Sequence, residues 1–246
     1  MHAHVHQLHP LVHRAPQRLC RRRSADRDAV GTVARAQGTA APTTPAAALQ
    51  ALVEGNARYA AGQPRERDFS ARRAALAQGQ APFAAVLGCA DSRVAPELAF
   101  DQSPGDLFIV RVAGNFVTPE GLGSLEFGSA VLGTKLILVL GHTSCGAVNA
   151  TVDALRQGSN TLPGSIARLV TAMKPGIEPV MAQPGDDLTR RALVANVQYN
   201  VRALETATPI LADLVARGAL AVRGGVYDLA TGPVSYTHLT LPTNRE

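Results

Sequence analysis

The chain has 246 residues, with 24 Lys or Arg against 19 Asp or Glu, which gives a net charge of +5. Residues 1–36 contain seven Arg and two Asp, so the whole excess lies there and the remainder has 17 basic and 17 acidic side chains. A neutral body lacks the basic surface that binds nucleic-acid backbones. No apolar run reaches the roughly 18 residues of a membrane span, so nucleic acid and membrane are both excluded as expected partners.

Residues 1–45 predict no packed structure. They combine five scattered His, three consecutive Arg and a linker rich in Pro, Thr and Ala. No apolar segment follows the basic residues, so a secretory signal is not supported and we expect a cytoplasmic protein. We interpret 1–45 as a disordered or spurious extension. Residues 46–234 form the expected folded domain, and 235–246 fit neither a strand nor a helix and are interpreted as a non-native tail.

Between residues 46 and 234, helical and strand patterns alternate. Apolar residues at helical spacing predict helices, and short apolar runs bounded by turn residues predict buried strands. In chain order we expect a helix at 46–61, a short helix at 71–78 capped by Asp68 or Ser70, a strand at 83–88, a strand at 107–113, a helix at 122–132, a strand at 135–140, helices at 146–157, 165–173, 188–206 and 209–217, and an outer strand that turns at 231–232. The alternation predicts an α/β fold with a central, mostly parallel β-sheet flanked by helices.

Two short motifs follow directly on predicted strands. One contains Cys89, Asp91 and Arg93, and the other contains His142 and Cys145. The carboxyl ends of neighbouring parallel strands form the edge at which α/β proteins bind ligands. The second motif holds the only His between residues 14 and 237, and the two motifs hold the only Cys after position 20. Two thiols and one imidazole are a ligand set that suits zinc and leave one coordination position open.

Other interpretations of the same residues remain open at this point. Cys89 and Cys145 could be ordinary buried thiols, since free Cys is among the most buried residue types, or they could have a redox role. Asp91 could bind the metal as a fourth ligand, or it could pair with Arg93 and accept a hydrogen bond from a zinc-bound hydroxide. An Asp–Arg pair after a strand could also be an ordinary surface ion pair.

The runs C-A-D-S-R-V, G-D-L-F-I-V-R-V-A-G-N and G-H-T-S-C-G-A resemble the β-class carbonic anhydrases, over residues 49 to 234. The resemblance implies a zinc lyase in which zinc-bound hydroxide converts carbon dioxide reversibly to bicarbonate and a proton. It implies that Cys89, His142 and Cys145 are the metal ligands and that Asp91 is a conditional fourth ligand. It also implies that Asp91 and Arg93 act together as a gate to the metal.

The resemblance further implies a small apolar substrate pocket. Gln80 matches the amide donor of that pocket, and Phe108 and Ala113 match apolar positions in it. Phe127 stands where the family usually has Tyr, so a hydroxyl donor is missing. Family members form dimers, often paired into tetramers, with the active site near the subunit interface, so we expect a homodimer or homotetramer.

Some alternatives concern the activity itself. A hydrolase of carbonyl sulfide or carbon disulfide would need the same zinc hydroxide, and an inactive zinc-binding module would need only the ligands. One subclass of the family inhibits itself by binding bicarbonate beside a Trp, an Arg and a Tyr. This chain has no Trp: Val86 and Phe127 stand in place of the aromatic pair, although Arg111 is present. We therefore expect that switch to be absent.

Overall fold

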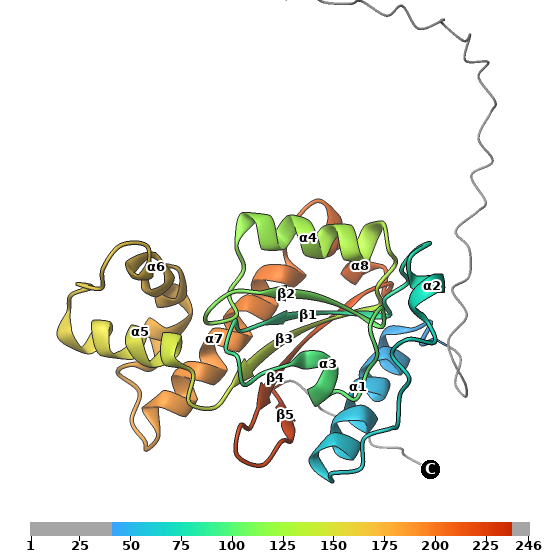
Figure 1. Ribbon diagram of the computed structural model, residues 1–246. Helices are drawn as coiled ribbons and strands as arrows, with labels where there is room; N and C mark the ends of the chain where they lie inside the picture. Colours follow the sequence, from blue (N-terminus) through green and yellow to red (C-terminus); the bar gives the residue numbers. More distant parts are fainter. Residues whose placement is uncertain (1–40, 238–246) are drawn as a thin grey trace, which may run out of the picture. The chain divides into compact units, whose positions relative to one another are not determined.

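A computed structural model describes residues 41–237, and its centre is a five-stranded sheet (Figure 1). The expected extension up to residue 40 and the expected tail from residue 238 lie outside the described residues. The strand order is β2-β1-β3-β4-β5; the first four strands are parallel and the fifth is antiparallel to its neighbour. The strands are β1 (Ala84–Gly88), β2 (Leu107–Arg111), β3 (Leu136–His142), β4 (Ala221–Tyr227) and β5 (Val234–Tyr236).

Helices cover both faces of this sheet, as predicted for an α/β fold. One face packs against α4, α7 and α8, with α5 and α6 stacked on α7, and the other face packs against α1 and α3 (Figure 1). The helices are α1 (Pro45–Ala60), α2 (Arg73–Leu76), α3 (Pro96–Ala99), α4 (Pro119–Ala130), α5 (Gly146–Gln157), α6 (Ile166–Ile177), α7 (Leu188–Glu205) and α8 (Ile210–Ala216), with a 3-10 turn at Glu178–Val180. None of the helices in the described part combines the length and the hydropathy that a bilayer crossing requires.

The two central strands, β1 and β3, are buried along their whole length. Their side chains alternate between the two faces, so that Ala85 and Leu87 join one core cluster while Ala84 and Val86 join the other. A strand buried on both faces reads as a continuous apolar run, which is why the sequence pattern was clear there. The register pairs Gly88 with Leu140, so the chain leaves β1 beside the end of β3.

Several element boundaries differ from the prediction. The third strand runs two residues further than expected and ends at His142, because its last residues pair with β4. The second strand ends at Arg111, two residues early, before a turn with positive φ at Gly114. The helix expected from residue 122 starts at Pro119, because the Thr118 side chain accepts a hydrogen bond from Gly121 and caps it.

Two predictions about loops were wrong. The short helix after Ser70 has only four residues and no side-chain cap; Asp68 instead accepts a hydrogen bond from the Ser70 amide, which makes a turn before the helix. Residues 235 and 236, which were expected to fit neither a strand nor a helix, belong to β5. Ser235 pairs with Val226 and Tyr236 with Gly225, so the outer hairpin includes them.

The first helix is tied to this outer hairpin by one buried side chain. The Asn56 amide nitrogen donates to the carbonyls of Ala99 and Gly232, each at 2.9 Å, and its oxygen accepts from the Val234 amide at 2.8 Å. All the polar atoms of this side chain are therefore engaged with segments far away in the sequence. Asn56 joins the two ends of the folded domain.

A buried carboxylate anchors the other side of α1. Asp101 is 2 % exposed and has a φ of 49°. Its oxygens lie 2.6 Å from Arg58 Nε and 2.5 Å from an Arg67 guanidinium nitrogen, and one also accepts from the Arg65 amide at 3.1 Å. Burial alone would raise the pKa of Asp101, but the bonds from Arg58 and Arg67 outweigh it and lower that pKa. The carboxylate thus holds α1 and the segment after it against the end of α3.

Candidate metal centre

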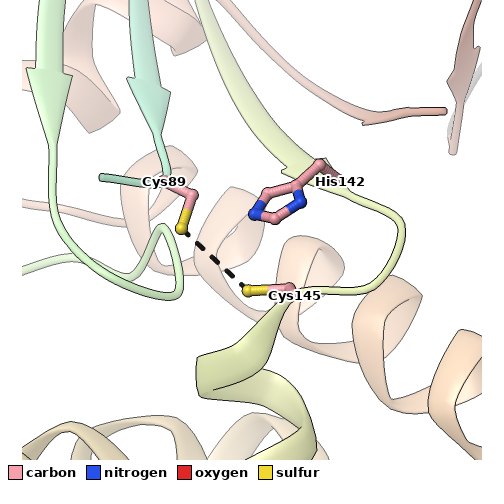
Figure 2. A group of neighbouring side chains, drawn as sticks. All are labelled: Cys89, His142 and Cys145. Carbon is pink, nitrogen blue, oxygen red and sulfur yellow. Dashed lines mark hydrogen bonds between the residues drawn. The ribbon is translucent and has the colours of Figure 1, made fainter. Parts of the chain in front are cut away.

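Three potential ligands meet at the carboxyl edge of the sheet. Cys89 is the first residue after β1, His142 is the last residue of β3, and Cys145 is the residue that precedes α5 (Figure 2). Their ligand atoms all lie within 4.8 Å of one another, and all three residues are buried. The structure therefore brings together the three side chains that the sequence proposed as metal ligands.

The spacing of these atoms fits a tetrahedral zinc ion. Two thiolates bound to one zinc at about 2.3 Å would lie about 3.8 Å apart in a tetrahedral site, and the Sγ atoms of Cys89 and Cys145 are 4.0 Å apart. A disulfide would need about 2.05 Å, and both cysteines are free thiols. The sulfurs are placed for a shared ion.

The imidazole is oriented for the same purpose. His142 Nδ1 donates to the carbonyl of Thr143 at 2.9 Å, which leaves the lone pair on Nε2. Nε2 is buried and has no hydrogen-bond partner among residues 41–237. A metal-binding His commonly has its other ring nitrogen fixed by a backbone carbonyl in this way. The orphaned nitrogen and the two thiols are a donor set that fits zinc.

The two thiols influence each other's protonation. A hydrogen bond from Cys145 lowers the pKa of Cys89 to about 4, although burial opposes this change. The same hydrogen bond, together with burial, raises the pKa of Cys145. The pair on its own therefore favours one thiolate and one thiol. A dication between them supplies the positive charge that a second thiolate requires.

Asp91 lies at the rim of this site and pairs with Arg93. The Arg93 Nε and a terminal guanidinium nitrogen donate to the two carboxylate oxygens at 2.9 and 2.7 Å, and the Arg93 amide donates to Oδ1 at 2.9 Å. These bonds, above all those from the guanidinium, lower the pKa of Asp91. Asp91 Oδ2 is 3.8 Å from His142 Nε2. The carboxylate is ionised, bidentately paired and next to the ligand cluster.

The loop that carries Cys89 and Asp91 is held by a side chain from the neighbouring strand. Arg111, the last residue of β2, donates to the carbonyls of Cys89 at 2.8 Å, Asp91 at 2.7 Å and Val94 at 3.0 Å. The sequence connected Arg111 only with a bicarbonate site. Arg111 lies opposite Gly88 in the strand register, next to the loop that begins at Cys89, and this position accounts for the contact. The register depends on the order of the strands in the sheet, which the sequence does not give.

The loop that carries His142 and Cys145 is held mainly by the backbone. The Thr143 amide donates to the carbonyl of Tyr227 at 2.9 Å, which prolongs the pairing of β3 with β4. The Thr143 hydroxyl accepts from the Leu229 amide, also at 2.9 Å. Cys145 then leads directly into α5, so both ligands of this loop are fixed by the ends of regular elements.

The residues expected to line the pocket fall into two groups. Ala113 is half-buried in the loop after β2, next to Gly114, whose amide donates to Cys89 Sγ at 3.3 Å. Phe108 lies four residues before Val112, the residue opposite Cys89, and is therefore about 13 Å away along the strand direction. It packs on Gly128 of α4 instead. Within one chain, Ala113 lies beside the ligands and Phe108 does not.

The other two pocket candidates also lie away from the ligands. Gln80 is exposed in the loop before β1, at the opposite end of that strand from Cys89, and lines a cavity of about 470 Å³ with Pro104 and Gly105. Phe127 is 48 % exposed on α4, two turns after the helix start. One copy of the chain therefore does not assemble the whole expected pocket.

Comparisons with known proteins show which family this chain belongs to. Residues 84–234 match the family model described as Carbonic anhydrase. Carbonic anhydrase 2 of Mycobacterium tuberculosis is 43 % identical over 194 residues, which are 77 % of this chain and 91 % of that protein.

Solved structures give the same result. A β-carbonic anhydrase from Coccomyxa in complex with acetazolamide superposes with a TM-score of 0.61 at 29 % identity, covering 80 % of this chain and 86 % of the other. One of two tetrameric β-carbonic anhydrases from Sordaria macrospora superposes with a TM-score of 0.57 at 25 % identity, covering 65 % and 83 %.

Proposed function

Because this chain belongs to the β-class carbonic anhydrase family, we propose that Cys89, His142 and Cys145 hold the zinc with which it hydrates carbon dioxide reversibly to bicarbonate and a proton. The observation that carries this assignment is the cluster of two free thiols and an unpartnered imidazole nitrogen within 4.8 Å. When bound, zinc lowers the pKa of a coordinated water and so supplies a nucleophile at neutral pH. No observation favours the carbonyl sulfide hydrolase or the inactive module over this activity.

The chain's own residues contribute orientation and charge. The two Arg93 bonds keep the Asp91 carboxylate ionised and turned so that an oxygen lies near the ligand cluster. In this geometry the carboxylate can accept a hydrogen bond from the attacking water and hold its lone pair toward carbon dioxide. Rotation of Asp91 away from Arg93 and onto the metal would fill the open position. We propose that the pair is the gate of the site.

A second copy of the chain completes the substrate pocket in this proposal. Gln80, Phe108 and Phe127 lie away from the ligands of their own chain, so they can line a pocket at the metal only if another copy presents them. Phe127 on α4 and Val131, the residue that caps the end of α4, are 48 % and 66 % exposed and lie four positions apart, which leaves an apolar surface for a partner. The tetrameric relatives from Sordaria macrospora support a homodimer or homotetramer.

Mixing two inactive variants tests this assembly. Gln80→Ala impairs the pocket residue and Cys145→Ser removes a metal ligand. If each metal centre uses the partner's Gln80, a mixed dimer regains one intact centre, so refolding the variants together should restore activity that neither has alone. No restoration in a confirmed mixed dimer would show that each centre uses its own Gln80.

Metal removal tests the activity itself. We expect about one zinc per chain in the purified protein, loss of carbon dioxide hydration after chelation, and recovery on adding zinc back. Hydration should exceed hydrolysis of carbonyl sulfide or carbon disulfide by the same preparation. A metal-free protein with full hydration activity would contradict the proposal.

The free thiols of the site also support the proposal that the protein works in a reducing compartment such as the cytoplasm.

A further inference from the structure

Helix α7 presents two buried amides to the loop that follows β2. Asn196 and Asn200 are 0 % and 2 % exposed and lie one turn apart on a helix face that is otherwise apolar, between Leu193, Val197 and Val201. Asn200 donates to the backbone and side-chain oxygens of Asn196, at 2.8 and 3.3 Å. The second contact leaves the Asn196 amide nitrogen free to point toward the loop.

Both amides bind the backbone of that loop. Asn196 Nδ2 donates to the carbonyl of Gly114 at 2.9 Å, and the Asn200 side-chain oxygen accepts from the Val117 amide at 2.8 Å. On its other side, Gly114 rests against Met173, whose Sδ would lie 2.3 Å from any Cβ added there. The glycine has a φ of +90°, so a side chain at this position would be strained as well as crowded. The loop is fixed from two directions.

The fixed loop reaches the metal centre through one hydrogen bond. The Gly114 amide donates to Cys89 Sγ at 3.3 Å. Hydrogen bonds to a ligand atom change the charge that the ligand gives to its metal, and outer partners of this kind affect both affinity and reactivity. Two hydrogen bonds connect Asn196 through Gly114 to the Cys89 sulfur, and all three of these residues are buried.

We propose that Asn196 is a positioning residue for the zinc centre: through Gly114 it fixes the N–H···S bond to Cys89 and so tunes that thiolate as a ligand. The inference rests on the proposed function of Cys89 as a zinc ligand. Asn200 supports it by orienting the Asn196 amide. A purely structural role for Asn196, as a partner for a buried carbonyl, would affect stability but not the properties of the thiolate.

The experiment compares Asn196→Leu with a matched control on the same helix. Leucine keeps the size of the side chain and removes the donor to Gly114. Val201→Ala is the control, because Val201 is fully buried on the same helix and lies against Gly224 of β4. The readouts are the dissociation constant for zinc, from chelator competition, and the thiolate-to-metal charge-transfer band of the cobalt-substituted protein.

We expect Asn196→Leu to weaken zinc binding by about 10- to 100-fold and to shift the charge-transfer band, while Val201→Ala matches the wild type in both. The proposal is overturned if Asn196→Leu leaves affinity and band unchanged, or if Val201→Ala changes them equally. If Asn196→Leu does not fold, Asn196→Ser, which is too short to reach Gly114, is judged by the same criteria. Failure of the underlying assignment is distinguishable, since wild-type protein would then show no thiolate band.

Discussion

Asp91 and Asp101 both pair with arginine, but their surroundings differ. Arg93, the partner of Asp91, has a side chain that is 55 % exposed, and the two residues are neighbours on one loop. Asp101 is buried and receives bonds from Arg58, Arg67 and a backbone amide. Water can replace a partner of Asp91 at little cost, whereas the side chain of Asp101 is 0 % exposed, so loss of a partner leaves a buried charge poorly paired. Burial therefore distinguishes the movable gate that we propose for Asp91 and Arg93 from the fixed anchor that Asp101 forms with Arg58 and Arg67.

Replacing Asp101, the fixed anchor, should give the largest effect of the changes considered, and the effect is on stability. Asp101→Ala leaves Arg58 and Arg67 facing each other without a counter-charge, and we expect it to lower the free energy of unfolding by about 3 kcal/mol. Denaturant unfolding measures this value. Asp101→Asn is the matched control, since Asn tolerates a φ of 49° and keeps one acceptor oxygen while it removes the charge. A loss below 1 kcal/mol in both variants would remove the distinction between anchor and gate.

Asp101 should also affect how the stability of the protein changes at acid pH. The pKa of Asp101 is lower in the folded state than its ordinary value of 3.8, so its contribution to stability is complete above that value and is lost as the pH falls through the folded pKa. We expect wild-type protein to lose stability below about pH 4 more steeply than Asp101→Asn. Both proteins should be compared without metal, so that acid release of zinc does not contribute. If the stability of the two proteins fell in parallel with decreasing pH, Asp101 would not be the source of this acid sensitivity.

The gate should affect catalysis and leave stability almost unchanged. We expect Asp91→Ala to lower kcat for carbon dioxide hydration by about 10²-fold, because the attacking water loses its orienting acceptor. The unfolding free energy should change by less than about 1 kcal/mol. Stopped-flow hydration and denaturant unfolding on one preparation check both numbers. An Asp91→Ala protein that unfolds as readily as Asp101→Ala would show that the exposed pair is an anchor too.

A smaller effect on kcat should come from replacing Arg111, whose side chain holds the loop that carries Asp91. Arg111→Met removes three hydrogen bonds to the carbonyls of the loop between Cys89 and Val94. We expect about tenfold lower kcat with zinc still bound, since the loop carries both Cys89 and Asp91. Arg111→Lys keeps the charge but not the forked donors, so it should recover only part of the rate. Full activity in Arg111→Met would show that the loop holds its shape without this residue.

The sequence predicted the parts of the molecule in which residue type and spacing are sufficient. The buried strands β1 and β3 were continuous apolar runs, and the family comparisons support the zinc assignment that Cys89, His142 and Cys145 suggested. The extent of β3 to His142 was missed, because its last residues are determined by pairing with β4 residues 85 positions further along the chain.

The supporting contacts of the site were not predictable in the same way. Asn196 and Asn200 at helical spacing within an apolar face gave a signal that polar groups were needed there, but not where they pointed. Their partners lie about 80 residues earlier, on a loop whose shape depends on the glycine at 114. Likewise, the family resemblance implied that Gln80 and Phe108 are pocket residues, but it did not show that one copy of the chain keeps them apart from the ligand cluster.

The side chain of Asn56 has a consequence for how the protein is made. Two of its three hydrogen bonds are to Gly232 and Val234, which the ribosome adds more than 170 residues after Asn56 itself. Until those residues emerge, a buried amide on the first helix lacks most of its partners, so that helix cannot dock with full stability on a nascent chain. The first helix of the domain to be synthesised is therefore fully stabilised only after the last hairpin has been synthesised.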